Sequence, residues 1–89
     1  MAIIKIPTPL RAYTDGEAQI QVEGETIAGA LQALVDQYPD LEPHLYNNGE
    51  LRNFVNVFLG DEDIRFLDGL ETEIDNDANL RIIPSIAGG

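Results

Sequence analysis

The last two residues, Gly88 and Gly89, have the clearest chemical potential in this sequence. At an average glycine usage of about 7%, a chain ends in two glycines only about once in 200 cases. Because glycine has no Cβ, the pair can pass through a narrow channel and leaves the carbonyl carbon of Gly89 unhindered. A carboxylate is a poor electrophile, so Gly89 must first gain a better leaving group, such as the adenylate that ATP supplies. An amine or a sulfur nucleophile can then attack it.

The other candidate groups do not assemble into a catalytic site. His44 is the single histidine of a sequence without cysteine, and no serine is placed to complete a nucleophilic triad. We therefore expect His44 to pack against a loop or lie on the surface. Acidic residues crowd positions 61–63 and 75–77, but both stretches lack the central glycine and distal glutamate of a calcium loop. We interpret them as turns, with a weak cation site as the alternative, and expect no enzymatic activity.

Length and composition predict one domain over residues 1–89. A compact fold of this size already buries only about 60–65% of its unfolded surface, so one core is expected and a second is not. Hydrophobic residues make up 44% of the sequence, and the absence of cysteine excludes disulfides and thiolate metal sites. We expect residues 85–89 to form a flexible tail that projects from this domain.

The charge of the chain restricts its partners. Sixteen acidic and five basic residues give a formal net charge of −11, which repels a phosphate backbone and an anionic membrane surface. No apolar run approaches about 18 residues, and the N-terminus shows no basic segment followed by a long apolar one. We therefore predict a cytoplasmic protein that binds neither nucleic acid nor membrane. The charge either serves solubility or guides the chain toward basic patches on larger enzymes.

Periodicity predicts strands on both sides of one confident helix. Thr26 stands at an N-cap position, apolar residues at helical spacing follow it up to Tyr38, and Pro39 ends the helix. A short helical turn is expected over residues 41–46 and a loop over residues 47–49. Alternation of apolar and polar residues predicts strands at Ala2–Ile6, Ala18–Glu23, Phe54–Leu59, Asp63–Phe66 and Asn79–Pro84.

This order predicts an α+β fold of the β-grasp (ubiquitin-like) kind, a mixed four- to five-stranded sheet with one main helix packed on one face. The first and last strands then pair in the middle. Alternation places Ile3, Phe58 and Ile83 on the face away from the helix, where clustered apolar residues mark a partner surface unless a loop covers them. In the tail, Ile86 and Ala87 complete this set of expected partner contacts.

Four stretches carry a family resemblance that spans nearly the whole chain. Phe54–Phe58, Asp61–Phe66, the turn Asp68–Leu70 and the ending Ile83–Gly89 together resemble the ThiS/MoaD family of sulfur carriers. Within that family they are most similar to the CysO-type branch of cysteine biosynthesis. Ser85 and Ile86 stand where related tails often carry alanine and valine, which leaves the branch less secure than the family.

The resemblance implies a protein co-substrate. A ubiquitin-activating-type enzyme (MoeB/ThiF-like) would adenylate Gly89, and a sulfur donor would convert it to a thiocarboxylate. In the cysteine branch the sulfur passes to an aminoacrylate on the pyridoxal phosphate of a cysteine-synthase-like enzyme, and a zinc peptidase releases the product. The carrier itself binds no cofactor, because the cofactors belong to its partners.

Three alternatives stay open. The runner-up within the family is the small subunit of molybdopterin synthase, which would share the Gly89 thiocarboxylate but dock permanently in a larger catalytic subunit. A ubiquitin-like modifier would join Gly89 to lysines of other proteins, although Lys5 is the only lysine on which chains could grow. An acidic interaction domain would make no use of its Gly-Gly end.

Overall fold

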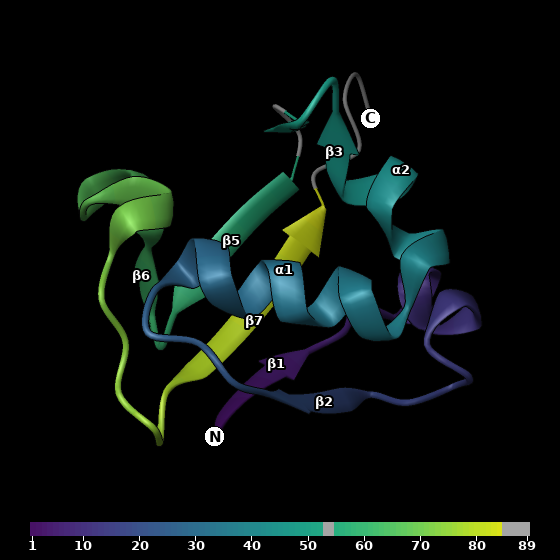
Figure 1. Ribbon diagram of the computed structural model, residues 1–89, viewed down its shortest axis with the longest axis horizontal. Helices are drawn as coiled ribbons and strands as arrows, with labels where there is room; N and C mark the ends of the chain where they lie inside the picture. Colours follow the sequence, from purple (N-terminus) through teal and green to yellow (C-terminus); the bar gives the residue numbers. More distant parts are fainter. Residues whose placement is uncertain (53–54, 85–89) are drawn as a thin grey trace.

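The computed structural model describes residues 1–52 and 55–84, which form a mixed sheet with one main helix across one face (Figure 1). The sheet has the order β2-β1-β7-β5-β6. Its central strands β1 and β7 run parallel, and all other neighbours are antiparallel. The bounds are β1 Ala2–Lys5, β2 Gln19–Val22, β5 Val55–Leu59, β6 Glu62–Asp63 and β7 Asn79–Pro84. The predicted fold, with the first and last strands paired in its middle, is confirmed.

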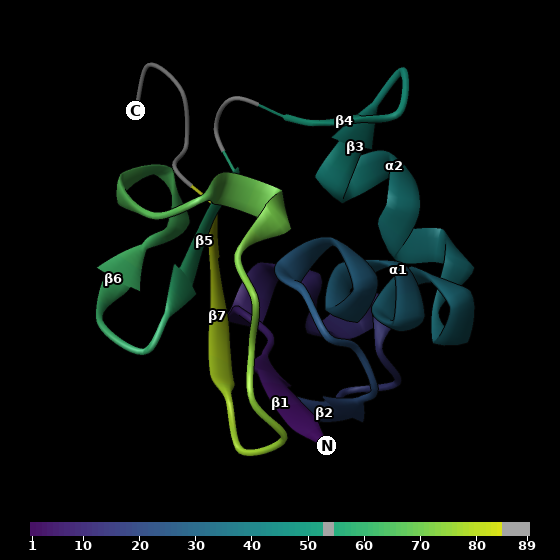
Figure 2. The same ribbon diagram turned by 60° about the vertical axis from the view of Figure 1, so that its left-hand side comes forward.

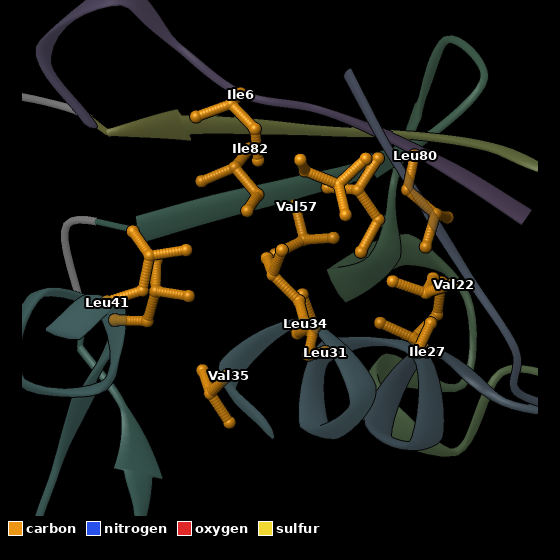
Figure 3. Packing of buried hydrophobic residues seen from close by; sticks show 14 of the residues in the cluster. Ile6, Val22, Ile27, Leu31, Leu34, Val35, Leu41, Val57, Leu80 and Ile82 are labelled. Carbon is orange, nitrogen blue, oxygen red and sulfur yellow. The ribbon is translucent and has the colours of Figure 1, made fainter. Parts of the chain in front are cut away.

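The core lies between the sheet and the helix α1 (Ile27–Gln37), and alternation along the strands fills it (Figure 3). One set of alternating strand residues points toward the helix and is buried. The other set faces away from it. The inward residues of the four longer strands are Ala2, Ile4, Ile20, Val22, Val55, Val57, Leu80 and Ile82. They meet the buried helix residues Ile27, Ala30, Leu31, Leu34 and Val35.

Local chemistry fixes the start of helix α1. The hydroxyl of Thr26 accepts a hydrogen bond from the backbone N–H of Gly29 at 3.1 Å, which satisfies one of the donors left free at a helix start. Just before it, Gly24 passes so close to the helix that a Cβ would lie 2.6 Å from the backbone nitrogen of Ala30. Only glycine fits there without a shift of backbone.

The segment after α1 folds as predicted in part. A 3-10 turn at Pro39–Leu41 leads into the short helix α2 (Glu42–Leu45). Strands β3 (Tyr46–Asn47) and β4 (Glu50–Leu51) then form a small hairpin that was predicted only as a loop. Its turn residues Asn48 and Gly49 both have positive φ, 55° and 83°. An Asn-Gly pair is a known signal for such a hairpin, so the sequence did contain it.

The prediction of a strand at Asp63–Phe66 is wrong. Strand β6 ends at Asp63, whose carboxylate accepts a hydrogen bond from the backbone N–H of Arg65 at 2.9 Å. This side-chain cap turns the chain into a 3-10 helix over Ile64–Phe66. A local carboxylate bond thus replaced the ladder hydrogen bonds that a continued strand would need.

Two more 3-10 helices connect the main elements, at Thr8–Tyr13 and Gly69–Glu71, and neither was predicted. Pro7 and Pro9 end the first strand as expected, but they also begin the first of these helices, where proline is tolerated. Among the described residues, no helix has the length and apolar character needed to cross a membrane.

Candidate functional site

The predicted reacting group is attached to the central strand of the sheet. β7 lies between β1 and β5, and its last residue, Pro84, pairs with Val55. In Figures 1 and 2, β7 ends at the side of the molecule opposite the N-terminus. Gly88 and Gly89, with the expected contacts Ile86 and Ala87, lie outside the described residues. Five residues follow Pro84, and a chain of that length spans at most about 17 Å.

The face of the sheet away from α1 carries the outward side chains of β7 and of its neighbouring strands. We call it the outer sheet face and define it by the nine outward residues of the four longer strands. Strand register places them together: Gln19, Gln21, Ile3, Lys5, Asn79, Arg81, Ile83, Asn56 and Phe58. Figure 2 shows these strands beside one another, with α1 to the right of the sheet.

The three apolar residues predicted for this face are all on it, but they do not form one continuous patch. Ile83 is 41% exposed, whereas Ile3 and Phe58 are half-buried. Phe58 lies opposite Arg81, which is two residues before Ile83 on β7. Ile3 sits on the other side of β7, opposite Asn79. Polar β7 residues therefore separate Ile3 from Phe58.

Arg81 is the centre of the outer sheet face. Its guanidinium lies 5.8 Å from the centre of the Phe58 ring, within the range of a cation–π interaction. It also donates to the carbonyl oxygen of Gly60 at 3.3 Å and to the carboxylate of Asp61 at 3.4 Å. Lys5 is its neighbour across the β1–β7 pairing. A depression of about 300 Å³ lies between these groups, lined by Lys5, Gly60, Asp61, Asn79 and Arg81.

A second surface feature was missed by sequence reasoning. Phe66, placed in a strand by alternation, is 82% exposed, and Leu67 next to it is 40% exposed. Beside them an open apolar groove of about 360 Å³ is lined by Leu51, Arg52, Val55, Val57, Ile64, Arg65, Gly69 and Leu70. The sequence signal that could have predicted the turn carrying Phe66 is Asp63, two residues before Arg65, at a typical capping position.

The remaining candidates have structural surroundings. The His44 ring stacks on Tyr13 with centroids 4.1 Å apart, as expected for a histidine that packs against a loop segment. Within residues 1–52 and 55–84, no group of three or more acidic or histidine side chains is placed to hold a metal ion. The backbone N–H of Arg65, then its side chain, lowers the pKa of Asp63. Burial, then the Glu42 carboxylate, raises the pKa of Tyr46.

A mixed sheet crossed by one helix, whose central strand leads to a Gly-Gly end, defines a ubiquitin-like protein of the β-grasp class. The chain belongs to the ThiS family, whose model matches residues 4–89. The sulfur carrier protein CysO of Mycobacterium tuberculosis (strain ATCC 25618 / H37Rv) is 35% identical over 89 residues, which cover 97% of this chain and 96% of the relative. Sulfur carrier proteins are small carriers, not catalysts.

Solved structures agree with this assignment. The Amycolatopsis orientalis BexX/CysO complex contains a chain with a TM-score of 0.91 and 34% identity, with 100% of both chains covered. The small archaeal modifier protein 1 of Methanosarcina acetivorans has a TM-score of 0.89 and 27% identity, with 99% of this chain and 95% of that chain covered. The chain is therefore similar both to a protein named as a sulfur carrier and to a protein named as a modifier.

Proposed function

We propose that this protein is a sulfur carrier that is adenylated and then thiocarboxylated at the carboxylate of Gly89, and that it donates this sulfur for cysteine synthesis. The observation that carries the proposal is the match of nearly the whole chain to a sulfur carrier of the CysO type, together with the Gly88-Gly89 end. The central strand β7 supports it, because it attaches the C-terminal residues to the middle of the sheet.

The chemistry requires two displacements. An oxygen of the Gly89 carboxylate attacks the α-phosphorus of ATP, and pyrophosphate leaves. A sulfur nucleophile such as hydrosulfide then attacks the carbonyl carbon of the acyl-adenylate. AMP leaves with the electrons of the broken C–O bond, and the proton of hydrosulfide passes to solvent. One carboxylate oxygen has then been replaced by sulfur.

The partners in this proposal are those that the family resemblance implies. A ubiquitin-activating-type enzyme supplies the site for ATP, and a pyridoxal-phosphate enzyme of the cysteine-synthase kind accepts the sulfur. The crystallised complex of BexX with a carrier 34% identical to this chain supports docking of the intact domain on a larger enzyme. The large subunit of molybdopterin synthase is the alternative acceptor. A cytoplasmic location, where these enzymes work, is part of the proposal.

Intact-mass analysis tests the proposal directly. The protein is incubated with ATP, its adenylating enzyme and sulfide, and we expect a mass gain equal to the difference between sulfur and oxygen, located on the C-terminal peptide. Omission of ATP is the control. An unchanged mass with an enzyme that thiocarboxylates another carrier would overturn the proposal.

Deletion of Gly89 tests which group reacts. The variant keeps a terminal glycine carboxylate but shortens the tail by one residue, up to about 3.5 Å. Because a misplacement of about 1 Å can cost on the order of a hundredfold in rate, we expect loss of ATP–pyrophosphate exchange. Addition of one alanine after Gly89 should have the same effect, since the glycine carbonyl then lies in a peptide bond.

A length-matched variant separates reach from identity. It combines the Gly89 deletion with one glycine inserted between Pro84 and Ser85, so that the tail regains its five residues. Recovery of exchange would show that reach dominates, whereas continued loss would show that the paired glycines are themselves required. Both variants should melt like the wild type. Full exchange in the simple deletion would contradict the role of Gly89.

A second function, protein modification, is favoured by the likeness to the small archaeal modifier protein 1. In that case Gly89 would be joined to lysines of other proteins. Antibody blots of cell extracts distinguish the two functions: a ladder of larger conjugates that disappears with the Gly89 deletion supports a modifier. A single unconjugated band supports a dedicated carrier.

A further inference from the structure

The open apolar groove beside Phe66 lies outside the outer sheet face. Two inward residues of β5, Val55 and Val57, line it, so it lies on the helix side of the sheet. The two 3-10 helices Ile64–Phe66 and Gly69–Glu71 contribute its other wall, near β6 at the edge of the sheet away from β2 (Figure 1). A partner that occupies this groove therefore leaves the outer sheet face uncovered.

Side-chain hydrogen bonds hold the wall that the two 3-10 helices form. The Asp63 carboxylate caps the first of them through the backbone N–H of Arg65 at 2.9 Å. The buried hydroxyl of Thr72 accepts a hydrogen bond from the backbone N–H of Asp68 at 3.1 Å and donates one to the carbonyl oxygen of Gly69 at 2.7 Å. These local bonds shape the groove before a partner arrives, which lowers the cost of ordering it on binding.

Exposed apolar side chains gather at the rim of the groove. Among the large apolar residues that the structure describes, four are exposed: Met1, Phe66, Leu67 and Ile83. Two of the four, Phe66 and Leu67, directly follow the groove residue Arg65. Aromatic and aliphatic surface left in water beside an apolar groove is typical of a site that binds another molecule.

The groove also differs in charge from the rest of the molecule. Two of the five basic residues of the chain, Arg52 and Arg65, line it, and none of its described lining residues is acidic. Asp63 and Asp68 belong to the turns of its wall. Asp63 bonds to Arg65 at 3.3 Å, but the Arg65 side chain is 60% exposed, and exposed ion pairs contribute little. Guanidinium groups beside an apolar surface suit an apolar side chain with a carboxylate next to it.

The groove lies beside the root of the reacting end. Val55, which lines it, pairs with Pro84, the last described residue of β7. Neighbouring strands lie about 4.8 Å apart. The five residues after Pro84 span at most about 17 Å. An enzyme that takes Gly89 into its active site therefore has part of its surface within reach of the groove.

We propose that this groove, with Phe66 at its rim, binds the enzyme that accepts the sulfur, through a segment in which an apolar side chain stands next to an aspartate or glutamate. This inference rests on the proposed function and names the chemistry of the acceptor's contact segment. The adenylating enzyme is expected on the outer sheet face, on the opposite side of β5. Because the two surfaces are separate, the acceptor can bind before the adenylating enzyme has left.

Binding measurements with matched variants test the proposal. The probe is the recombinant pyridoxal-phosphate enzyme of the cysteine-synthase kind, titrated with the full-length carrier. We expect Phe66→Gln and Arg65→Gln each to weaken binding about fivefold or more, because each removes one half of the apolar and cationic contact. The control for Phe66→Gln is Phe58→Gln on the outer sheet face. The control for Arg65→Gln is Asn76→Asp, an equal change of net charge on an exposed loop, which should alter affinity less than about twofold.

The adenylating enzyme provides the reciprocal measurement. Titrated against that enzyme, the two phenylalanine variants should show the reverse order, with Phe58→Gln weakened and Phe66→Gln normal. If Phe58→Gln weakens binding of the acceptor as much as Phe66→Gln does, both enzymes use the outer sheet face and the proposal is overturned. Binding of the acceptor to Arg65→Gln as tight as to Asn76→Asp contradicts the predicted carboxylate.

A photo-cross-link locates the contact segment. The photoreactive amino acid p-benzoylphenylalanine is incorporated in place of Phe66, and in a control protein in place of Phe58. Peptide mapping that joins the probe at position 66 to an acceptor segment with an apolar residue next to an aspartate or glutamate supports the proposal. Coupling of the acceptor only to the probe at position 58 overturns it.

The outcomes separate this inference from the proposed function. A carrier that gains no sulfur, but whose variants bind the acceptor in the expected pattern, overturns the proposed function and leaves the groove intact as a binding site. Normal gain and transfer of sulfur, with Phe66→Gln and Arg65→Gln bound as tightly as their controls, overturns the groove and leaves the function intact. Absence of any binding to the wild type overturns both the groove and the role in cysteine synthesis. Melting curves of every variant exclude loss of the fold as the cause.

Discussion

The inner and outer faces of the sheet are made by alternate residues of the same strands, yet they obey different constraints. On β7, Leu80 and Ile82 are buried against the helix side, whereas Arg81 and Ile83 face outward. The inner face is uniformly aliphatic, because any polar group there would be buried without a partner. The outer face mixes aromatic, aliphatic, amide and cationic side chains, which burial alone does not require. The contrast shows that burial restricts the inner face alone, and the outer face is the predicted partner surface.

The largest effect on stability should come from the inner face. Leu80 has no exposed surface, so Leu80→Ala leaves a cavity and should lower the free energy of unfolding by about 2–5 kcal/mol. The control is its exposed neighbour, Asn79→Ala, which should change that free energy within about 0.5 kcal/mol. Urea denaturation measures both. Equal losses would contradict the division between the faces.

A smaller effect on stability, with a clear effect on binding, should come from the apolar residues of the outer face. Phe58→Gln should weaken binding to the adenylating enzyme several-fold, while its melting temperature stays close to that of the wild type. Glutamine is preferable to aspartate at this position, because a carboxylate would lie opposite Asp63. Ile83→Gln should behave similarly.

Phe66→Gln is the matched control for Phe58→Gln. Phe66 is the more exposed aromatic residue, at 82%, but it lies on the 3-10 helix outside the outer sheet face. We expect its replacement to leave binding unchanged. Weaker binding with Phe66→Gln and normal binding with Phe58→Gln would move the docking surface to the edge of the sheet, beside the apolar groove.

The smallest expected effect concerns pH and the edge strand β6. The hydrogen bond from the backbone N–H of Arg65 lowers the pKa of Asp63 below its ordinary value near 3.8, with a further contribution from the Arg65 side chain. A carboxyl whose pKa is lower in the folded state stabilises the fold above its unfolded pKa, and this contribution is lost as pH falls through the folded value. Asp63→Asn should therefore make stability less sensitive to acid.

An NMR titration of the Asp63 carboxyl measures this shift. Arg65→Gln is the control, since it removes the side-chain contact but keeps the backbone N–H, which is the larger cause. The pKa of Asp63 should stay lowered in that variant. A return to the ordinary value would show that the ion pair, and not the cap, sets the turn at the end of β6.

Much of the fold was predictable because its signals are local. Alternation gave the strands β1, β2 and β7 to within one or two residues, and the spacing from Thr26 to Pro39 gave helix α1. Such patterns follow directly from burial on one side of each element. The strand at Asp63–Phe66 failed because its alternation was real, but a side-chain hydrogen bond within two residues competed with the ladder. The candidate reacting end, Gly88 and Gly89, is a prediction from the sequence alone.

The sequence by itself determined the helix, the long strands, the net charge of −11 and the Gly88-Gly89 end. Only the tertiary structure decided which residues became neighbours across strands. Lys5 and Arg81 lie near opposite ends of the chain, and they become cross-strand neighbours only through the parallel pairing of β1 with β7. Composition sums charges without regard to position, whereas strand register places Lys5 beside Arg81, with Asp61 next to them. The physical reason is that pairing between distant strands is set by closure of the whole core, not by either strand alone.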